Sequence, residues 1–264
     1  MKRLIYQVCI GNAKNSALYK HCIQSVANYA ERHGIDHRVQ STPILRIKPD
    51  IFGSNRSKES YEKHGGYLPI YEKENAFSFV DEYDQIAIVD ADIYIRPDSP
   101  NIFDDFAPEY SFGAVCEREM PITDVYQQKI LNYSRMQYEY LHKQKKIDFK
   151  PNKLGYEFFN MGMILINSAL FKRYLQGQTP KQFIERTEFK DFVDGQGAWK
   201  WSTDQTLLNY FLKKYQVPTQ HMDHKWNGLY SVNVDIKKCH FIHFFLKDKL
   251  PSSGENVEEL MKKI

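Results

Sequence analysis

The chain has 264 residues, of which 42% are hydrophobic and 14% aromatic, enough to bury the core of one large α/β domain or two small ones. Its 36 basic and 33 acidic side chains leave a net charge of +3, which argues against a nucleic-acid-binding stripe or a polybasic membrane surface. No apolar run approaches the roughly 18 residues that a membrane span needs.

The cysteines are few, far apart and without a Cys-x-x-Cys spacing, which favours free thiols in a reducing compartment. They are Cys9, Cys22, Cys116 and Cys239. The N-terminal apolar run is interrupted by Gln7 and followed by a glycine turn, so it predicts a strand and not a signal peptide. We therefore expect a soluble, cytoplasmic protein; the sequence leaves open whether it forms a homodimer.

The N-terminal part predicts alternating strands and helices. A strand over 4–10 ends at Gly11, a helix runs from Ser16 to His33, and a second strand covers 36–40. This strand–turn–helix–strand opening is typical of a nucleotide-binding α/β fold.

The next stretch predicts a surface loop and then a helix that leads into a buried strand. Residues 44–66, rich in charge, proline and glycine, predict the loop, and Pro69 can begin a helix over 70–82. Two short extended pieces follow at 85–89 and 93–95.

The remainder of the chain predicts strands at 111–116, 161–166 and 239–243, helices at 122–146, 169–175, 180–187, 203–214 and 255–263, and a loop at 191–201. It contains no internal repeat and no proline- or serine-rich linker. A single domain over 1–264 is therefore expected.

Two aspartates separated by one residue follow the apolar strand 85–89. In an extended segment Asp90 and Asp92 point to the same side, so both can reach one divalent cation. Ligands of open α/β sheets bind beyond the carboxyl ends of the strands, and a metal there can neutralise a nucleotide diphosphate. The alternative is a pair of solvated turn carboxylates, although acids of that kind are uncommon between two apolar runs.

Four segments occur in a set order along the chain: the strand with Asp90-Ala91-Asp92, the Asn-x-Gly strand of 159–167, Asp204-Gln205 with Leu207, Leu208 and Asn209, and the stretch from His243 to Lys249. Together they resemble glycosyltransferases of the GT-A fold, most closely the family 8 type, which retains anomeric configuration. The resemblance implies an α/β fold, a Rossmann-like single GT-A domain with a mixed, mainly parallel central sheet flanked by helices. Residues 1–95 would form the nucleotide-binding half, and 96–264 the acceptor and sugar half with a metal-binding C-terminal segment.

The resemblance makes His243 the third metal ligand beside Asp90 and Asp92. A set of two carboxylates and one imidazole favours Mn²⁺ over Mg²⁺. His240 lies three residues earlier on the same predicted strand and would point to the opposite side. The alternative is that His243 is an ordinary buried histidine of that strand.

The resemblance also implies contacts to a UDP-sugar donor. The residues concerned are Val8 and Ile10 beneath the uracil, Tyr19 stacking on it, and Ala91, Lys73 and Lys249 at the sugar diphosphate. The C-terminal segment departs from the family pattern, because Leu246 replaces a glycine and Leu250-Pro251 stands where Pro-Trp is usual. Lys247 could therefore take the place of Lys249.

For the reacting sugar, the resemblance assigns Asn160 to a hydrogen bond with the sugar or acceptor, Asp204 to a donor hydroxyl and Gln205 to the oxocarbenium-like carbon. Asp204 and Gln205 can equally begin a helix capped by Ser202 or Thr203, and the two interpretations are compatible. The aromatic residues expected on the acceptor side are Trp199, Trp201, Trp226 and Tyr230.

The predicted activity is metal-dependent transfer of a sugar from a UDP-sugar to an acceptor hydroxyl, with retention. One alternative is another metal-dependent phosphotransfer enzyme, a nucleotidyltransferase or nuclease, although the third carboxylate or phosphate-binding glycine loop of such sites is not evident. Another is a non-catalytic nucleotide-sugar binder. With 18 tyrosines, the chain could also glycosylate itself, as glycogenin-like primers do.

Overall fold

The computed structural model describes residues 1–54 and 58–264. Within these residues six strands form one mixed sheet, and a smaller sheet of three strands adjoins it. The larger sheet contains, in spatial order, β2 (Asp36–Gln40), β1 (Arg3–Val8), β3 (Gln85–Val89), β6 (Phe159–Asn167), β5 (Phe112–Cys116) and β7 (Thr219–His221). The smaller sheet contains β4 (Ile93–Ile95), β9 (Phe241–His243) and β8 (Gly228–Leu229).

The α-helices of the described residues are α1 (Ala17–His33), α2 (Lys58–Lys63), α3 (Asp124–Lys143), α4 (Ser168–Leu175), α5 (Pro180–Ile184), α6 (Lys190–Asp194), α7 (Asp204–Lys214) and α8 (Val257–Met261). Short 3₁₀ helices cover Gly11–Asn15, Pro69–Phe79, Ile102–Asp105, Glu117–Glu119, Thr187–Phe189, Gly197–Trp199, His224–Trp226, Ile236–Lys238, Lys247–Lys249 and Pro251–Gly254. In the part of the chain that the structure describes, we find no helix with the length and apolar content to cross a membrane.

The larger sheet is mixed because β6 runs against both of its neighbours. Strand β1 pairs in parallel with β2 and β3, and β5 pairs in parallel with β7, whereas β6 is antiparallel to β3 and β5. All five residues of β3 are buried, as expected for a central strand covered on both faces. This confirms the predicted α/β fold with a mixed, mainly parallel sheet.

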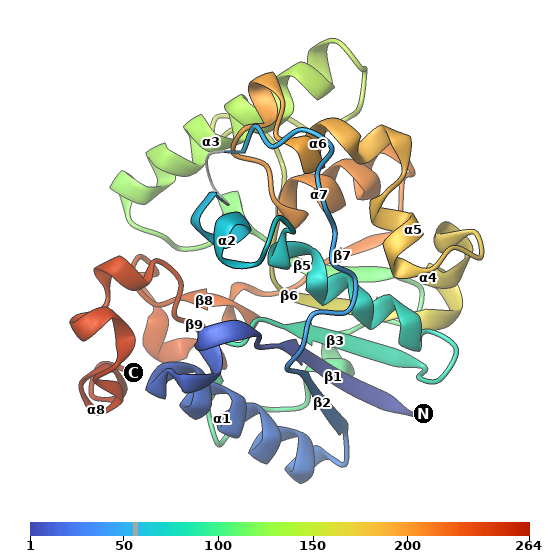
Figure 1. Ribbon diagram of the computed structural model, residues 1–264. Helices are drawn as coiled ribbons and strands as arrows, with labels where there is room; N and C mark the ends of the chain where they lie inside the picture. The colour runs from blue at the N-terminus through green and yellow to red at the C-terminus, as the bar shows by residue number, and fades with distance from the viewer. Residues whose placement is uncertain (55–57) are drawn as a thin grey trace.

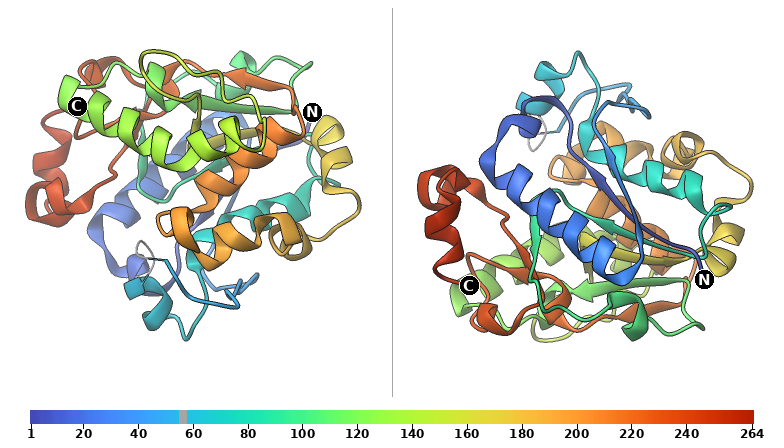
Figure 2. Two further views of the ribbon diagram at one scale, coloured as in Figure 1. Left: turned by 90° about the horizontal axis from the view of Figure 1, so that it is seen from above. Right: turned by 90° about the horizontal axis from the view of Figure 1, so that it is seen from below.

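Helices cover both faces of this sheet. Helix α1 lies across one face, and the 3₁₀ helix Pro69–Phe79 lies with α5 and α7 on the other (Figure 1). Helices α3 and α7 lie side by side when the molecule is viewed from above (Figure 2), and Gln137 of α3 accepts a hydrogen bond from Thr206 of α7. Gly34 ends α1 in the left-handed conformation, at φ 63°, as its place after the helix predicts.

Several predicted elements differ from the structure. The segment predicted as a helix over 70–82 is the 3₁₀ helix Pro69–Phe79. Its buried residues include Glu72 and Glu74 besides apolar ones. Tertiary packing, and not an apolar stripe, therefore determines the type of helix. The predicted loop 191–201 contains most of α6, and the predicted loop 44–66 contains α2; its residues 55–57 lie outside the described part. Strands β7 and β8 were not predicted, because β7 has three polar residues and no apolar position, and β8 has only two residues.

Candidate active site

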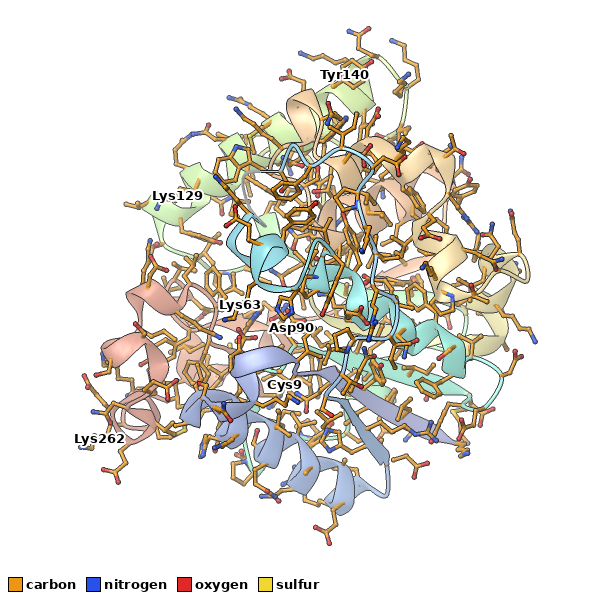
Figure 3. All side chains as sticks on the ribbon, in the orientation of Figure 1. Cys9, Lys63, Asp90, Lys129, Tyr140 and Lys262 are labelled. Carbon is orange, nitrogen blue, oxygen red and sulfur yellow. The ribbon has the colours of Figure 1, made fainter. Side chains whose placement is uncertain are left out.

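A cavity of about 680 Å³ opens where β1 and β3 end. The predicted site residues that line it are Val8, Ile10, Tyr19, Lys73, Asp90, Asn160, Asp204, Gln205 and His243. Asp90 lies near the middle of the molecule, close to Cys9 at the end of β1 (Figure 3). The position matches the rule that ligands of open α/β sheets bind beyond the carboxyl ends of the strands.

The three predicted metal ligands converge beside this cavity. One ligand atom from each of Asp90, Asp92 and His243 lies within 4.8 Å of the others. His243 Nε2 is 3.4 Å from Asp92 Oδ1 and 3.8 Å from Asp90 Oδ2. The distant parts of the chain meet because β4 pairs antiparallel with β9, which places Ile93 opposite His243. Ala91, between the two aspartates, is buried.

The environment of His243 orients its ring for a metal. Its Nδ1 lies 3.1 Å from the Oδ1 of Asn227, so Nδ1–H donates to that amide and Nε2 is left facing the carboxylates. Gly162 makes room for the ring, since a Cβ at that position would lie 2.5 Å from His243 Cε1. The donor set and the space around it therefore fit a divalent cation.

The pKa values of the cluster show how strongly its groups interact. Burial alone would lower the pKa of His243, but Asp92 and Asp90 raise it above the ordinary 6.5. Burial opposes ionisation of Asp92 too, yet the imidazole of His243 holds that pKa below its usual value. Burial raises the pKa of Asp90 in spite of the nearby Lys73. A metal bound here would compete with protons for the atoms of His243 and Asp90.

Lys73 joins the metal cluster to the predicted sugar-binding carboxylate. Its Nζ lies 3.2 Å from Asp90 Oδ1, 2.7 Å from Asp204 Oδ2 and 2.7 Å from the carbonyl oxygen of Met161. Burial disfavours its charge, but Asp204, Asp90 and Glu74 outweigh this and raise the lysine pKa. The ammonium group is thus enclosed by oxygen atoms on the protein and fixes the positions of both aspartates.

Asn160 lies at the centre of a second group of hydrogen bonds. Its Nδ2 donates to Glu117 Oε2 at 2.9 Å, while its Oδ1 accepts from the Asn227 amide at 2.8 Å and the Gly162 N–H at 2.9 Å. Sequence reasoning did not find Glu117 or Asn227, because neither stands in a local pattern that distinguishes it. Asn160 therefore links β6 to the residue that orients His243.

The start of α7 is both a capped helix and part of the site. Thr203 is its N-cap, and the threonine Oγ1 accepts the backbone N–H of Gln205 at 3.2 Å. The Gln205 side chain accepts the Met161 N–H at 3.4 Å, and Asn209 pairs with both backbone groups of Phe159. These bonds hold the helix start rigidly against β6.

The C-terminal lysines differ in position. Lys247 Nζ contacts the hydroxyl and ring of Tyr19, a residue that lines the cavity, and burial lowers the pKa of this lysine. Lys249 is exposed, and neither lysine is part of the cavity lining itself. Leu246, where the family pattern has glycine, adopts the left-handed conformation at φ 56° that a glycine favours.

The aromatic residues expected on the acceptor side do not line this cavity. Trp226 is buried against Phe241, Tyr230 packs on Phe244, and Trp201 is partly exposed outside the cavity lining. Instead, Tyr126 and Tyr133 of α3 line the cavity.

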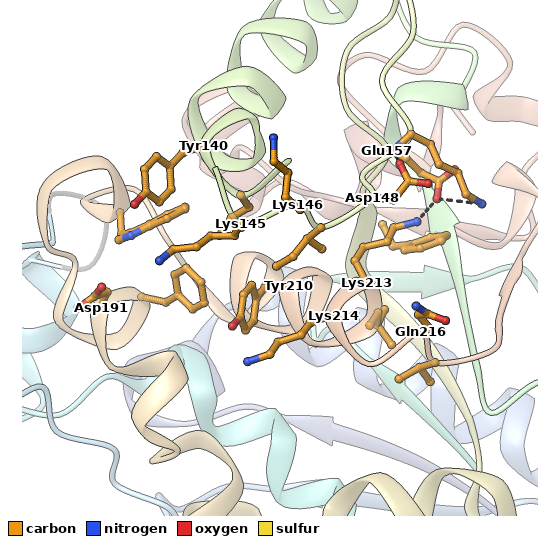
Figure 4. A pocket seen from close by; sticks show the side chains of 18 of the residues that line it. Tyr140, Lys145, Lys146, Asp148, Glu157, Asp191, Tyr210, Lys213, Lys214 and Gln216 are labelled. Carbon is orange, nitrogen blue, oxygen red and sulfur yellow. Dashed lines mark hydrogen bonds and ion pairs between the residues drawn. The ribbon is translucent and has the colours of Figure 1, made fainter. Parts of the chain in front are cut away.

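A second cavity, of about 1150 Å³, lies between the C-terminal parts of α3 and α7. Trp199 belongs to its wall, as do Tyr140 and Tyr210, with Lys145 and Lys214 reaching in beside them (Figure 4). It shares none of its lining residues with the first cavity.

Comparison with known proteins agrees with this geometry. The family model for glycosyl transferase family 8 matches residues 10–249. Among solved structures, the galactosyltransferase LgtC in complex with donor and acceptor sugar analogues is 14% identical over 98% of this chain and 94% of that chain, with a TM-score of 0.54. A glycosyltransferase involved in the glycosylation of the major capsid of PBCV-1 is 12% identical over 99% and 100%, with a TM-score of 0.53. Mouse xyloside xylosyltransferase 1 is 14% identical over 95% and 100%, with a TM-score of 0.50. A comparison with curated protein sequences found no match.

The mixed sheet and its structural matches define the GT-A fold of glycosyltransferases. The chain belongs to glycosyl transferase family 8, whose model covers most of its length. It is a glycosyltransferase, as the resemblance in the sequence predicted.

Proposed function

We propose that the protein transfers a sugar from a UDP-sugar to an acceptor hydroxyl with the help of a divalent metal and with retention at the anomeric carbon. The observation that carries this proposal is the convergence of Asp90, Asp92 and His243 beside the cavity that Asp204 also lines. Two carboxylates and one imidazole favour Mn²⁺ over Mg²⁺. When bound there, the metal would act as a Lewis acid for the departing diphosphate.

The chain's own residues would position the donor. Val8 and Ile10, at the end of β1, would lie beneath the uracil, and Tyr19 would stack on it. Lys73 bridges Asp90 and Asp204 through two ion pairs and would add a positive charge at the sugar diphosphate. Because Lys247 contacts Tyr19 of the cavity wall whereas Lys249 is exposed, Lys247 is the better candidate for a second contact to phosphate.

The sugar itself would lie between β6 and the start of α7. Asp204 would accept a hydrogen bond from a donor hydroxyl, Gln205 would face the anomeric carbon, and Asn160 would donate to the sugar or the acceptor. Each is mounted on hydrogen-bonded backbone, so little reorganisation accompanies the reaction. Departing UDP can accept the proton of the acceptor hydroxyl on the same face of the sugar, which is compatible with retention.

The test is a UDP-release assay with a panel of UDP-sugars, with and without Mn²⁺. We expect metal-dependent release with at least one donor, and NMR of the product should show the donor's anomeric configuration. An inverted product would overturn retention. If the protein bound the donor but released no UDP, it would be a non-catalytic nucleotide-sugar binder. Nucleoside monophosphate products would indicate a phosphotransfer enzyme.

Two further proposals concern where the protein is located and whether it glycosylates itself. Its four buried free thiols suit a reducing compartment, which supports a cytoplasmic location and is tested by cell fractionation. Self-glycosylation on tyrosine is tested by mass spectrometry of the protein after incubation with donor. The division at residue 95 into nucleotide and acceptor halves stays a prediction.

A further inference from the structure

A cysteine, a glutamate and a histidine converge outside the candidate active site, at the carboxyl end of β5. One ligand atom from each of Cys116, Glu119 and His221 lies within 4.8 Å of the others. None of the three lines the donor cavity. We propose that these side chains form a second metal site, suited to a zinc-class transition metal, that is independent of the donor site.

The fold brings the three ligands together through one pair of strands. Strands β5 and β7 are parallel, with Ala114 opposite His221. Cys116 ends β5 beyond an irregularity in its pairing with β6 between Ala114 and Val115, and there its thiol comes close to the ligand atoms of Glu119 and His221. Glu119 follows in the 3₁₀ turn that directly succeeds β5. A metal bound here would join the edge strand β7 to the segment that leads into α3.

The surroundings of His221 resemble those of a metal-bound histidine. Its Nδ1 is 3.4 Å from Glu119 Oε2, and its Nε2 is 3.7 Å from Oε2 of the buried Glu157. Metal-bound histidines commonly donate their second ring N–H to a carboxylate, which fixes the ring's orientation. In this arrangement Nδ1 would bind the metal beside Glu119, and Nε2 would face Glu157 at 3.7 Å, longer than a hydrogen bond.

In the described part of the chain, the nearby cations leave the Glu119 oxygen that faces His221 without a cation partner, but they share Glu157. Lys213 pairs with Glu157 through Oε1, an ion pair that Figure 4 shows, and Arg118 lies 3.6 Å from Oε2, the oxygen that also faces His221 Nε2. The Arg118 Nε faces Glu119 Oε1 at 3.7 Å, so Oε2 of that carboxylate still faces His221. The cluster therefore keeps one carboxylate oxygen and one imidazole nitrogen facing each other beside the cysteine.

The chemistry of the ligands selects the metal. A thiolate and an imidazole prefer Zn²⁺ or Co²⁺ to Mg²⁺ or Ca²⁺. Burial raises the pKa of the Cys116 thiol to about 12, so the thiol carries its proton when no metal is bound. Metal binding would release that proton to solvent and form the metal–sulfur bond. Glu119 and His221 are exposed, which leaves water access to the remaining coordination position.

Titration of the metal-free protein with CoCl₂ tests the proposal. We expect one equivalent of Co²⁺ to produce the near-ultraviolet charge-transfer band of a Co²⁺–thiolate bond, and Zn²⁺ to remove it by competition. Cys116→Ser should abolish the band. His221→Gln and Glu119→Gln, which replace exposed side chains, should weaken Co²⁺ binding at least about 10-fold while circular dichroism shows a folded protein.

The cysteine near the other cluster provides the matched control. Cys9 lines the donor cavity, so Cys9→Ser should keep the band if the thiolate is Cys116. The Asp92→Asn variant should also keep it, because that substitution alters only the donor-site ligands. Absence of the band in the wild-type protein would overturn the proposal, as would its loss in Cys9→Ser. Either result would leave the proposed transferase activity unaffected.

Discussion

The two clusters of side chains that could bind a metal occupy corresponding places on either side of β6. Strands β3 and β5 both pair antiparallel with β6, and each cluster begins where one of these strands ends. The first cluster has oxygen and imidazole ligands, and a hydrogen-bonded asparagine orients its histidine. The second has a buried thiol, and its other two ligands are exposed at the sheet edge. Equivalent positions in a sheet thus acquire different chemistry from the segments that pack beside them.

The largest expected effect is the loss of transfer activity when the first cluster loses its imidazole. His243→Ala should lower UDP-sugar turnover by on the order of 10³-fold, since a metal contributes several kcal/mol to charge stabilisation. His240→Ala is the matched control, because that ring packs on Trp226 with centroids 4.9 Å apart. Turnover is measured by UDP release at saturating Mn²⁺. If His243→Ala retained activity, the first cluster would not be the catalytic metal site.

A smaller effect is expected from the residue that orients His243. Asn227→Ala removes the acceptor for Nδ1–H and should weaken Mn²⁺ binding by about 10- to 100-fold, measured by calorimetry. Asn227→Asp keeps an acceptor there and should restore part of the affinity. Unchanged Mn²⁺ affinity in Asn227→Ala would show that the ring needs no orientation by this amide.

The two clusters should also respond differently to pH. His243 has a pKa above 6.5 and must lose its proton before Nε2 can bind a metal. Mn²⁺ affinity should therefore increase by up to about tenfold per pH unit and level off only above that raised pKa. For the second cluster the Cys116 pKa is about 12, so Co²⁺ affinity should keep rising throughout the neutral and mildly alkaline range. Calorimetric titrations over a pH series would contradict this if Mn²⁺ affinity levelled off below pH 6.5.

The smallest effect concerns stability next to the first cluster. Both carboxylate oxygens of Glu74 are buried without a hydrogen bond among the described residues, and burial, with Asp204 nearby, raises its pKa well above 4.5. Above pH 4.5 the folded state then holds a proton on Glu74 that the unfolded chain releases. The free energy of unfolding therefore falls as pH rises above 4.5, by at most about 1.4 kcal/mol per pH unit. Glu74→Gln should flatten this dependence in urea unfolding.

The neighbouring Glu72 gives the matched contrast. It is equally buried, but its oxygens accept the backbone N–H groups of Ile44, Leu45 and Arg46 at 2.7 to 3.0 Å. Glu72→Gln should therefore destabilise the protein by about 1–3 kcal/mol. If Glu72→Gln and Glu74→Gln changed the free energy of unfolding equally, hydrogen bonding would not explain a difference in stability between these two carboxylates.

Much of the fold follows from local patterns in the sequence. The apolar run before Asp90 and the helical spacing in α1 each identify an element without its neighbours, because burial of one face imposes a period on the chain. The segment Pro69–Phe79 was harder to predict, since buried Glu72 and Glu74 interrupt its apolar pattern. The three-residue strand β7 is polar throughout, unlike the apolar three-residue strand β4, and β8 has only two residues, so neither β7 nor β8 shows a pattern.

The sequence by itself determined the aspartate pair, the α/β fold and, through ordered motifs, the family. Only the tertiary structure brought His243 against Asp92, Asn227 behind the ring, and Lys73 between two carboxylates. It alone placed His221 beside Cys116. These contacts join strands and loops that are far apart in the chain, and they depend on strand pairing and side-chain packing. A periodic sequence pattern reports only which face of one element is buried, so it cannot predict them.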